Sequence, residues 1–376
     1  MSHVLPKPTA ASRDRHERDL IELTALPTAA GREDRVVAWV QRWVKRRKVV
    51  VTRDGYGNML LSRAGAKPTK RPLVFTAHLD HPAFVVTEVD GKTLTAEFRG
   101  GVQDAYFVGT KVRWWPGDGE AKRNRKKGMP GRVTALRPAD PNVPGSYKTA
   151  TLTFARAPKA AVGDVVTWDV GGAVIRGGKL HAPACDDLAG LAAGLAAFGE
   201  LLKQRGFVAD VRFLCTRAEE VGFVGAIGAA QSGLLPPASR MVVLENSKAS
   251  DHAPLGGGPV VRVGDYTSTF SPQLTAAVAR AAQAVAAGDS GFQWQRKLMT
   301  GGTCEASAYL VFGYEATCVC LPLGNYHNMN EDQRKIAREY VAIDDFHGLV
   351  RLVMAMGQRA AEPEAIDPLR HRLDGL

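Results

Sequence analysis

The strongest constraint on the fold is a set of four short, nearly uninterrupted apolar segments spread along the chain. They are residues 74–77, 211–215, 241–244 and 316–321. Such continuous hydrophobicity is typical of strands that are covered on both faces. Apolar and small residues recur at helical spacing in the segments 188–202, 272–287 and 343–356. Strands that alternate with helices predict an α/β layer architecture.

The segment from residue 86 to residue 177 has a different pattern. Its apolar runs are short and alternating, at residues 112–115, 150–154 and 165–168, and glycine and proline interrupt them. Asp90-Gly91 is a hairpin turn signal, and no long helical pattern is present. We therefore predict a discontinuous larger domain, residues 1–85 and 178–376, and an inserted β-rich domain, residues 86–177.

Histidine and carboxylate side chains stand where the predicted strands end and just before the first long helix. They are His78, Asp80, Asp186, Glu219, Glu220, Glu245 and His327. In open α/β sheets, ligands bind at the carboxyl ends of the strands. Two histidines with several carboxylates and no thiolate pair suit a hydrolytic site for zinc, cobalt or manganese.

The number of these residues matches a centre for two metal ions. Each ion needs about three protein ligands and an open position for water. If one carboxylate bridges both ions, five residues supply six metal bonds: His78, Asp186, Glu220, Glu245 and His327. Each has a structural alternative when taken alone, since Asp186 could cap a helix and paired glutamates are usually solvated. Their convergence on one edge of the sheet favours the metal centre.

The same motifs resemble the co-catalytic aminopeptidases, and most closely the M42 family, the glutamyl aminopeptidase or TET-peptidase group, which is related to M28 and M20. They are His78-Leu79-Asp80, Asp186-Asp187, residues 219–222, Glu245 and His327, with glycine-containing segments at residues 54–58, 163–166, 255–259 and 301–303. The resemblance implies a zinc-aminopeptidase-like fold, with a mixed central sheet, helices on both faces and a small inserted β domain. It also implies a homo-oligomer that removes the N-terminal residue from peptide substrates.

The resemblance further implies a role for each site residue. Asp186 would bridge two divalent ions, zinc with cobalt or manganese as alternatives, and would carry a cis peptide bond to its neighbour. The other ligands would be His78 and Glu245 for one ion, and Glu220 and His327 for the other. Asp80 would orient His78 through a hydrogen bond, and Glu219 would be the general base.

Four residues depart from the family pattern. His81 stands where an acidic residue commonly follows the first His-x-Asp motif, and Glu245 stands where aspartate is frequent. Cys304 and Glu305 follow the Gly-Gly-Thr segment in place of a small acidic stretch. These changes bear on specificity more than on hydrolysis.

The composition narrows the choice of partners and compartment. The formal net charge of +11 is partly local, because the run 122–127 is basic within the loop 111–127. This loop lacks aromatic residues at stacking intervals, so we expect a solvated loop and no nucleic-acid partner. No segment approaches the roughly 20 apolar residues of a membrane span. Without a signal peptide pattern, the expected compartment is the cytoplasm, and the five cysteines are expected to be buried free thiols.

Two other functions fit part of this pattern. One is a related amidohydrolase of the M28 or M20 type, such as a deacylase or carboxypeptidase; the M20 enzymes usually carry a helix-bearing insert. The other is a non-catalytic binding protein on a peptidase scaffold. The complete set of ligands together with Glu219 favours the aminopeptidase.

Overall fold

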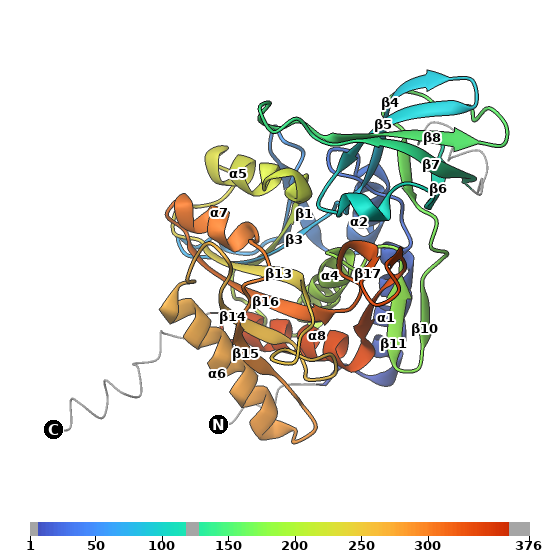
Figure 1. Cartoon of the computed structure of the whole chain (residues 1–376). Coiled ribbons are helices and arrows are strands. Elements are labelled where there is room, and N and C mark those ends of the chain that lie inside the picture. Colours follow the sequence, from blue (N-terminus) through green and yellow to red (C-terminus); the bar gives the residue numbers. More distant parts are fainter. Residues whose placement is uncertain (1–6, 118–127, 361–376) are drawn as a thin grey trace.

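The computed structural model describes residues 7–117 and 128–360, so the basic run 122–127 lies outside the described residues. Its centre is an eight-stranded sheet (Figure 1). In spatial order its strands are β1 (Val49–Arg53), β2 (Met59–Arg63), β12 (Val211–Thr216), β3 (Leu73–His78), β13 (Arg240–Lys248), β16 (Glu315–Leu323), β14 (Val260–Gly264) and β15 (Gln295–Leu298).

The four apolar segments form the middle of this sheet. Strands β12, β3, β13 and β16 are neighbours and run parallel. Strands β2 and β14 flank them in antiparallel orientation, so the sheet is mixed, as predicted. Because the four central strands are parallel, their carboxyl ends lie at one edge of the sheet.

Helices cover both faces of the sheet, because successive strand residues point to opposite sides. On β3, for example, Phe75 packs into one core and Val74 into the other. The first face is covered by α1 (Ala10–Thr24), α2 (Asp34–Lys45), α4 (Leu188–Lys203), α6 (Pro272–Gly288) and α8 (Ile343–Gln358). The opposite face is covered by α5 (Val224–Gln231) and α7 (Glu305–Val311). The predicted helices are α4, α6 and α8.

Helix α4 packs unusually close to the sheet at Gly194. A Cβ atom placed there would lie 2.2 Å from Cε2 of Phe213 and 2.6 Å from Cδ1 of Leu244. Those side chains belong to β12 and β13, so the glycine allows the helix to approach both central strands. The N-terminus of α4 is thereby held beside the strand ends.

The inserted segment folds into a closed antiparallel barrel at one end of the molecule (Figure 1). Around the barrel the strands are β4 (Ala83–Asp90), β5 (Thr93–Arg99), β8 (Lys148–Phe154), β7 (Met129–Arg137), β6 (Lys111–Trp115) and β9 (Val165–Trp168). Gly91 makes the β4–β5 turn with a positive φ of 55°. In its described part the only helical element is the 3₁₀ turn η1 (Asp104–Tyr106). The proposed domain boundaries stay a prediction.

The barrel has an aromatic core of its own. The rings of Phe84, Phe98, Phe107 and Trp168 meet mostly edge to face, with centroids 4.8 to 5.9 Å apart. Aromatic pairs prefer such geometry and each adds about 1 kcal/mol beyond area burial. The barrel is therefore packed independently of the large sheet.

A small three-stranded sheet joins the segment that follows the barrel to the segment that precedes α8. It contains β10 (Val174–Arg176), β11 (Lys179–Ala182) and β19 (Glu339–Ala342). The strands β17 (Met329–Asn330) and β18 (Lys335–Ile336) form a separate pair. In β11 and β19, Ala182 lies opposite Glu339, which places Glu339 next to the segment that leads to Asp186.

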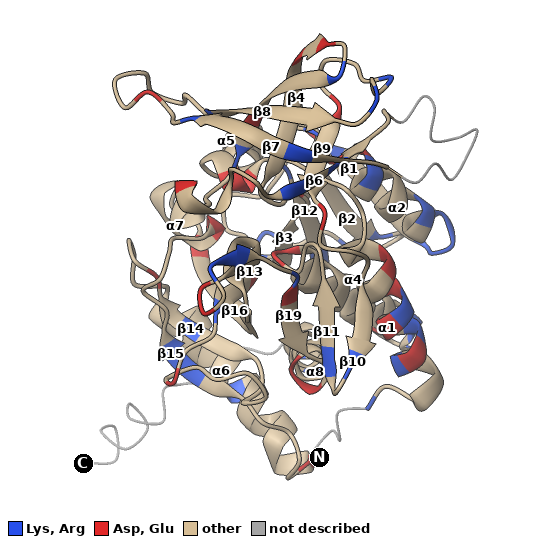
Figure 2. Cartoon of the chain, turned by 45° about the vertical axis from the view of Figure 1, so that its right-hand side comes forward, with Lys and Arg blue, Asp and Glu red and all other residues tan. Residues whose placement is uncertain are grey.

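Other sequence predictions can be compared with the described residues. The five cysteines are free and buried, as predicted. Lys and Arg residues are distributed over several elements, among them α1, α2 and the barrel strands (Figure 2). No helix in the described parts of the chain has both the length and the apolar character of a membrane span.

Candidate metal centre

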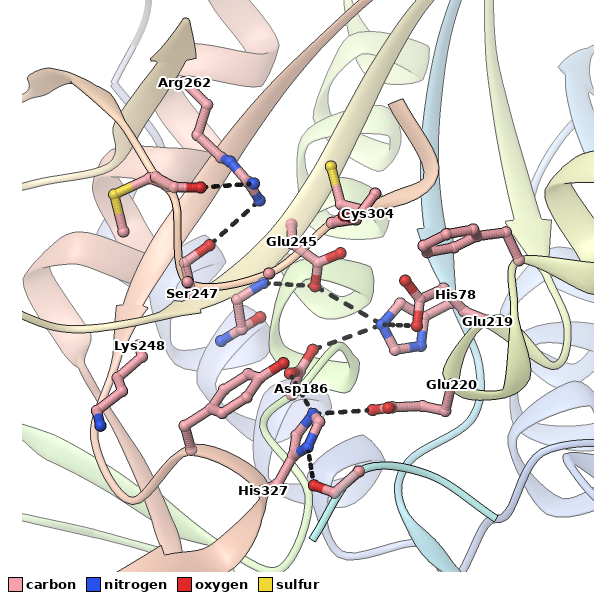
Figure 3. Close-up of a pocket in the computed structure, with 18 of the residues that line it drawn as sticks. His78, Asp186, Glu219, Glu220, Glu245, Ser247, Lys248, Arg262, Cys304 and His327 are labelled. Atoms are coloured by element: carbon pink, nitrogen blue, oxygen red, sulfur yellow. Dashed lines mark hydrogen bonds and ion pairs between the residues drawn. The ribbon is translucent and has the colours of Figure 1, made fainter. Parts of the chain in front are cut away.

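The predicted site residues lie together at the carboxyl edge of the central sheet (Figure 3). The positions that hold them are the last residue of β3, the loop after it, the residues before α4, the 3₁₀ turn η2 (Glu219–Val221) after β12, the strand β13 and the 3₁₀ turn η3 (Tyr326–Asn328) after β16. In one respect the expected local structure was wrong, because β13 does not end at Glu245 but continues to Lys248.

One group of potential ligands surrounds Nε2 of His78. This atom lies 3.4 Å from Oδ1 of Asp186 and 3.6 Å from Oε1 of Glu245. The ligand atoms of the three residues lie within 4.8 Å of one another. A divalent ion needs about three such ligands at roughly 2 Å, so this group has the composition and spacing of a metal site.

A second group surrounds Nε2 of His327. It lies 3.5 Å from Oδ2 of Asp186 and 3.4 Å from Oε1 of Glu220, and these three residues also lie within ligand spacing. The two groups share only Asp186, whose two oxygens face different histidines. His78 forms a third possible group with Glu219 and Glu220.

Asp80 holds the backbone of the turn that carries Glu219 and Glu220. Its oxygens accept the backbone N–H groups of Glu219 and Glu220, each at 3.0 Å. Its Oδ1 also lies 3.5 Å from Nδ1 of His78, at the outer limit of a hydrogen bond. Asp80 therefore fixes the turn that carries the two glutamates and faces the histidine that it was predicted to orient.

Two other supporting groups, Glu339 and the carbonyl of Gly101, were not predicted. Glu339, which is fully buried, accepts backbone N–H groups from Cys185 at 2.6 Å, Asp186 at 3.0 Å and His327 at 2.8 Å. The carbonyl of Gly101, from the barrel side, lies 2.5 Å from Nδ1 of His327 and accepts a hydrogen bond from it. A lone glutamate in the short apolar strand β19 was the only available signal for Glu339.

Backbone geometry at the centre is unusual. The Asp186–Asp187 peptide bond is cis, which confirms the expectation drawn from the family resemblance. Ala218, Asn325, His327 and Asn328 have positive φ angles although none is glycine. Positive φ angles at non-glycine residues occur where the surrounding structure holds the backbone, and they cluster at functional sites.

The ionisable groups of the centre are strongly coupled. Burial opposes the charged forms of His78 and His327, but the carboxylates around them outweigh burial and raise the pKa of both rings well above the usual value. Burial would raise the pKa of Asp186, yet the two histidines that face its carboxylate lower it. Burial raises the pKa of Glu245 to about 7 and that of Glu219 well above its usual value.

This charge distribution suits cations. Carboxylates outnumber histidines in a region where most of these side chains are buried, and uncompensated buried charge is unfavourable by several kcal/mol per ion. Oδ1 of Asp186 and Oε1 of Glu220 are buried without a hydrogen-bond donor. Oxygen and imidazole ligands with unused lone pairs are what zinc, cobalt and manganese require, so the residues present fit two divalent ions.

A cavity of about 300 Å³ opens over the centre. Its wall opposite His327 contains Asn246 and Arg262, which are both 3% exposed. Neither side-chain amide atom of Asn246 has a hydrogen-bond partner, and Nε of Arg262 has none. The cavity therefore offers unused polar groups beside the metal ligands (Figure 3).

Comparison with known proteins gives a family match over part of the chain. No curated protein matches the chain by sequence, but the model of the family described as M42 glutamyl aminopeptidase matches residues 154–338. The matched region contains all the candidate ligands except His78.

Solved structures share the fold. An aminopeptidase from the archaeon Desulfurococcus kamchatkensis is 20% identical, with a TM-score of 0.73 over 94% of this chain and 99% of that one. The TET1 peptidase of Pyrococcus horikoshii, described as assembling into a tetrahedron or a large octahedral shell, is 20% identical, with a TM-score of 0.71 over 91% and 99%. The chain is therefore similar to the M42 peptidases in sequence over residues 154–338 and shares the fold of solved aminopeptidase structures over most of its length.

Proposed function

We propose that the protein is an aminopeptidase that uses two divalent metal ions to hydrolyse the N-terminal peptide bond of peptides. The observation that carries this proposal is the position of Asp186, whose two oxygens face His78 and His327 at 3.4 and 3.5 Å. A carboxylate in this position can bridge two ions. His78 and Glu245 would complete one site, and Glu220 and His327 the other.

The ions, zinc with cobalt or manganese as alternatives, would supply Lewis-acid chemistry and an activated water at neutral pH. The protein's contribution is to orient these groups. Asp80 and Glu339 hold the backbone of the ligand-bearing turns by five hydrogen bonds to N–H groups. Such supporting contacts fix ligand geometry and typically change metal affinity or activity 10- to 100-fold.

Glu219 is the proposed general base. Its carboxylate is buried beside the centre, with Oε2 3.9 Å from Nε2 of His78, and it belongs to neither ligand group that contains Asp186. Burial raises the pKa of Glu219, which strengthens it as a proton acceptor. It would take the proton from the attacking water and deliver it to the leaving amine.

Arg262 supports a preference for an acidic N-terminal residue, in line with the glutamyl description of the family. Its guanidinium lines the cavity, donates to Oγ of Ser247 at 3.3 Å and to the carbonyl of Met299 at 3.5 Å, and lies 5.7 Å from the centroid of the Phe270 ring. Within the described residues it makes no ion pair with a carboxylate. A buried cation without a counter-charge is unfavourable, and a glutamyl or aspartyl side chain would provide one.

The function is tested by metal analysis together with a panel of aminoacyl p-nitroanilides assayed with zinc, cobalt and manganese. We expect two ions per chain and the highest kcat/KM for glutamyl or aspartyl substrates. Fewer than one tightly bound ion and no turnover of any substrate would instead favour a non-catalytic binding protein. Turnover of only acylated or C-terminal substrates would favour a deacylase or carboxypeptidase.

The acidic preference has a matched control. Lys248 also lines the cavity, but its ammonium group is paired with Glu331 at 2.7 Å. Arg262→Met should reduce the preference for glutamyl over leucyl substrates at least tenfold, whereas Lys248→Met should leave it nearly unchanged. An unchanged preference in Arg262→Met would refute the role of Arg262 and leave the metal-dependent hydrolysis intact.

We also propose a homo-oligomer, because the Pyrococcus horikoshii neighbour is described as assembling into a tetrahedron or a large octahedral shell. Light scattering of the purified protein tests this directly. A mass equal to the 40.4 kDa chain at micromolar concentration would contradict it.

A further inference from the structure

His81 lies beside the candidate metal centre, at a position where the sequence departs from the M42 pattern. The side chain is 4% exposed and follows Asp80 directly in the chain. Its Nδ1 lies 2.5 Å from the backbone carbonyl oxygen of Asp186, and its Nε2 lies 3.0 Å from Oδ1 of Asn328. The ring therefore spans two segments that are distant in sequence.

The orientation of the Asn328 side chain is fixed by its other contacts. Its Nδ2 donates to the carbonyls of Pro183 at 2.9 Å and Ala337 at 3.1 Å. The atom that faces His81 is consequently the amide oxygen, which can only accept. Since the other partner of the ring is a backbone carbonyl, both ring nitrogens of His81 face hydrogen-bond acceptors.

These two segments carry ligands of the same proposed ion. Asp186 stands before α4, and Asn328 is the neighbour of His327 in η3. Glu339 connects the same two segments by accepting the N–H groups of Asp186 and His327. His81 and Glu339 thus both connect the same pair of backbone segments through hydrogen bonds.

We propose that His81 is a positioning residue that sets the separation of Asp186 and His327. It would thereby set the affinity for the ion held by Asp186, Glu220 and His327. The ion held by His78, Asp186 and Glu245 depends on it less, because neither His78 nor Glu245 contacts the His81 ring through a hydrogen bond. This inference rests on the proposed two-ion function.

Two substitutions test the two hydrogen-bond contacts of His81 separately. His81→Gln places an amide N–H near the position of Nε2 and can still reach Asn328, but it loses the carbonyl of Asp186. His81→Asn places an N–H near the position of Nδ1 and can still reach Asp186, but it loses Asn328. His252→Gln, at an exposed turn residue, is the control for the same chemical change.

The measurement is stepwise zinc binding to the ion-free full-length protein, by calorimetry and by competition with a chelator. We expect both His81 variants to bind one ion as the wild type does and the other ion 10- to 100-fold more weakly. Activity of the variants should recover as zinc is raised, which a general folding defect would not allow. The His252 variant should match the wild type.

The outcomes separate this inference from the function on which it rests. If the wild type binds fewer than two ions, the proposed function fails. If the wild type binds two ions and both His81 variants bind them equally well, or lose both ions to the same extent, the role of His81 is refuted alone. Circular dichroism shows which variants are folded, and a single folded variant is enough to decide.

Discussion

Replacement of Glu219 by glutamine tests whether Glu219 is the general base and its neighbour Glu220 the metal ligand. The backbone N–H of Glu219, not its side chain, is anchored on Asp80 at 3.0 Å, so Glu219→Gln leaves this anchor in place. Glutamine has nearly the same volume as glutamate, so no cavity forms. The substitution removes one proton acceptor and one negative charge from the centre.

The expected loss follows from the role of the carboxylate. General base catalysis typically contributes 10²- to 10⁴-fold, which corresponds to about 3–5 kcal/mol at 1.36 kcal/mol per factor of ten. The kcat of Glu219→Gln should therefore fall by two to four orders of magnitude. Because Glu219 is outside the two ligand groups that share Asp186, the metal content should stay at the wild-type value.

The assay combines steady-state hydrolysis of a glutamyl p-nitroanilide with metal analysis of the same samples. Glu220→Gln is the matched comparison, because its Oε1 lies 3.4 Å from Nε2 of His327 and it should lose one ion. Two results would refute the reasoning. Either Glu219→Gln loses metal, or it keeps kcat within tenfold of the wild type.

Three further predictions concern a ligand, a buried acid and a core glycine. His327→Ala should lower occupancy of one ion selectively, measured by metal analysis; unchanged content would remove His327 from the ligands. Burial raises the pKa of Glu305 to about 7 from 4.5, so its stabilising contribution is present below pH 4.5 and is lost as pH rises through 7. Relative to the wild type, ion-free Glu305→Gln should gain about 3 kcal/mol of unfolding free energy between pH 4.5 and 8, measured with urea; a constant difference would contradict this. Gly194→Ala should lower the unfolding free energy by about 1–3 kcal/mol, because its Cβ would lie 2.2 Å from Phe213; unchanged stability would mean that the packing relaxes.

The central strands and the long helices were predictable because burial on both faces, or along a broad stripe, leaves a continuous or periodic signal in the sequence. The outer strands were not predicted. Residues of β1 and β15 alternate between partly buried and exposed positions, so polar side chains such as Gln295 and Arg296 resemble a loop. An edge strand is recognised by its pairing partner, and pairing is a long-range property.

The clustering of the candidate metal ligands was predictable for a related reason. Parallel strands bring their carboxyl ends to one edge, so residues that follow separate strands become neighbours whatever their distance in sequence. The supporting groups do not obey this rule. Glu339 reaches Asp186 because β19 pairs with β11, and Gly101 reaches His327 from the barrel. Nothing in the local pattern around either residue specifies these contacts.

Arg262 is a residue whose unusual character is visible in the sequence but whose position at the cavity is not. A charged residue inside the apolar run Val260–Gly264 contradicts the pattern of a buried strand, and that contradiction is visible in the sequence. The structure adds what the run alone does not: β14 pairs antiparallel with β16, and this pairing places the guanidinium on the cavity wall beside the metal ligands. A cation that is buried without a carboxylate partner lowers stability unless a ligand supplies the counter-charge. The same reasoning predicts that an acidic product or a free glutamate stabilises the wild type against thermal unfolding and does not stabilise Arg262→Met. Equal stabilisation of both proteins would show that the carboxylate binds elsewhere.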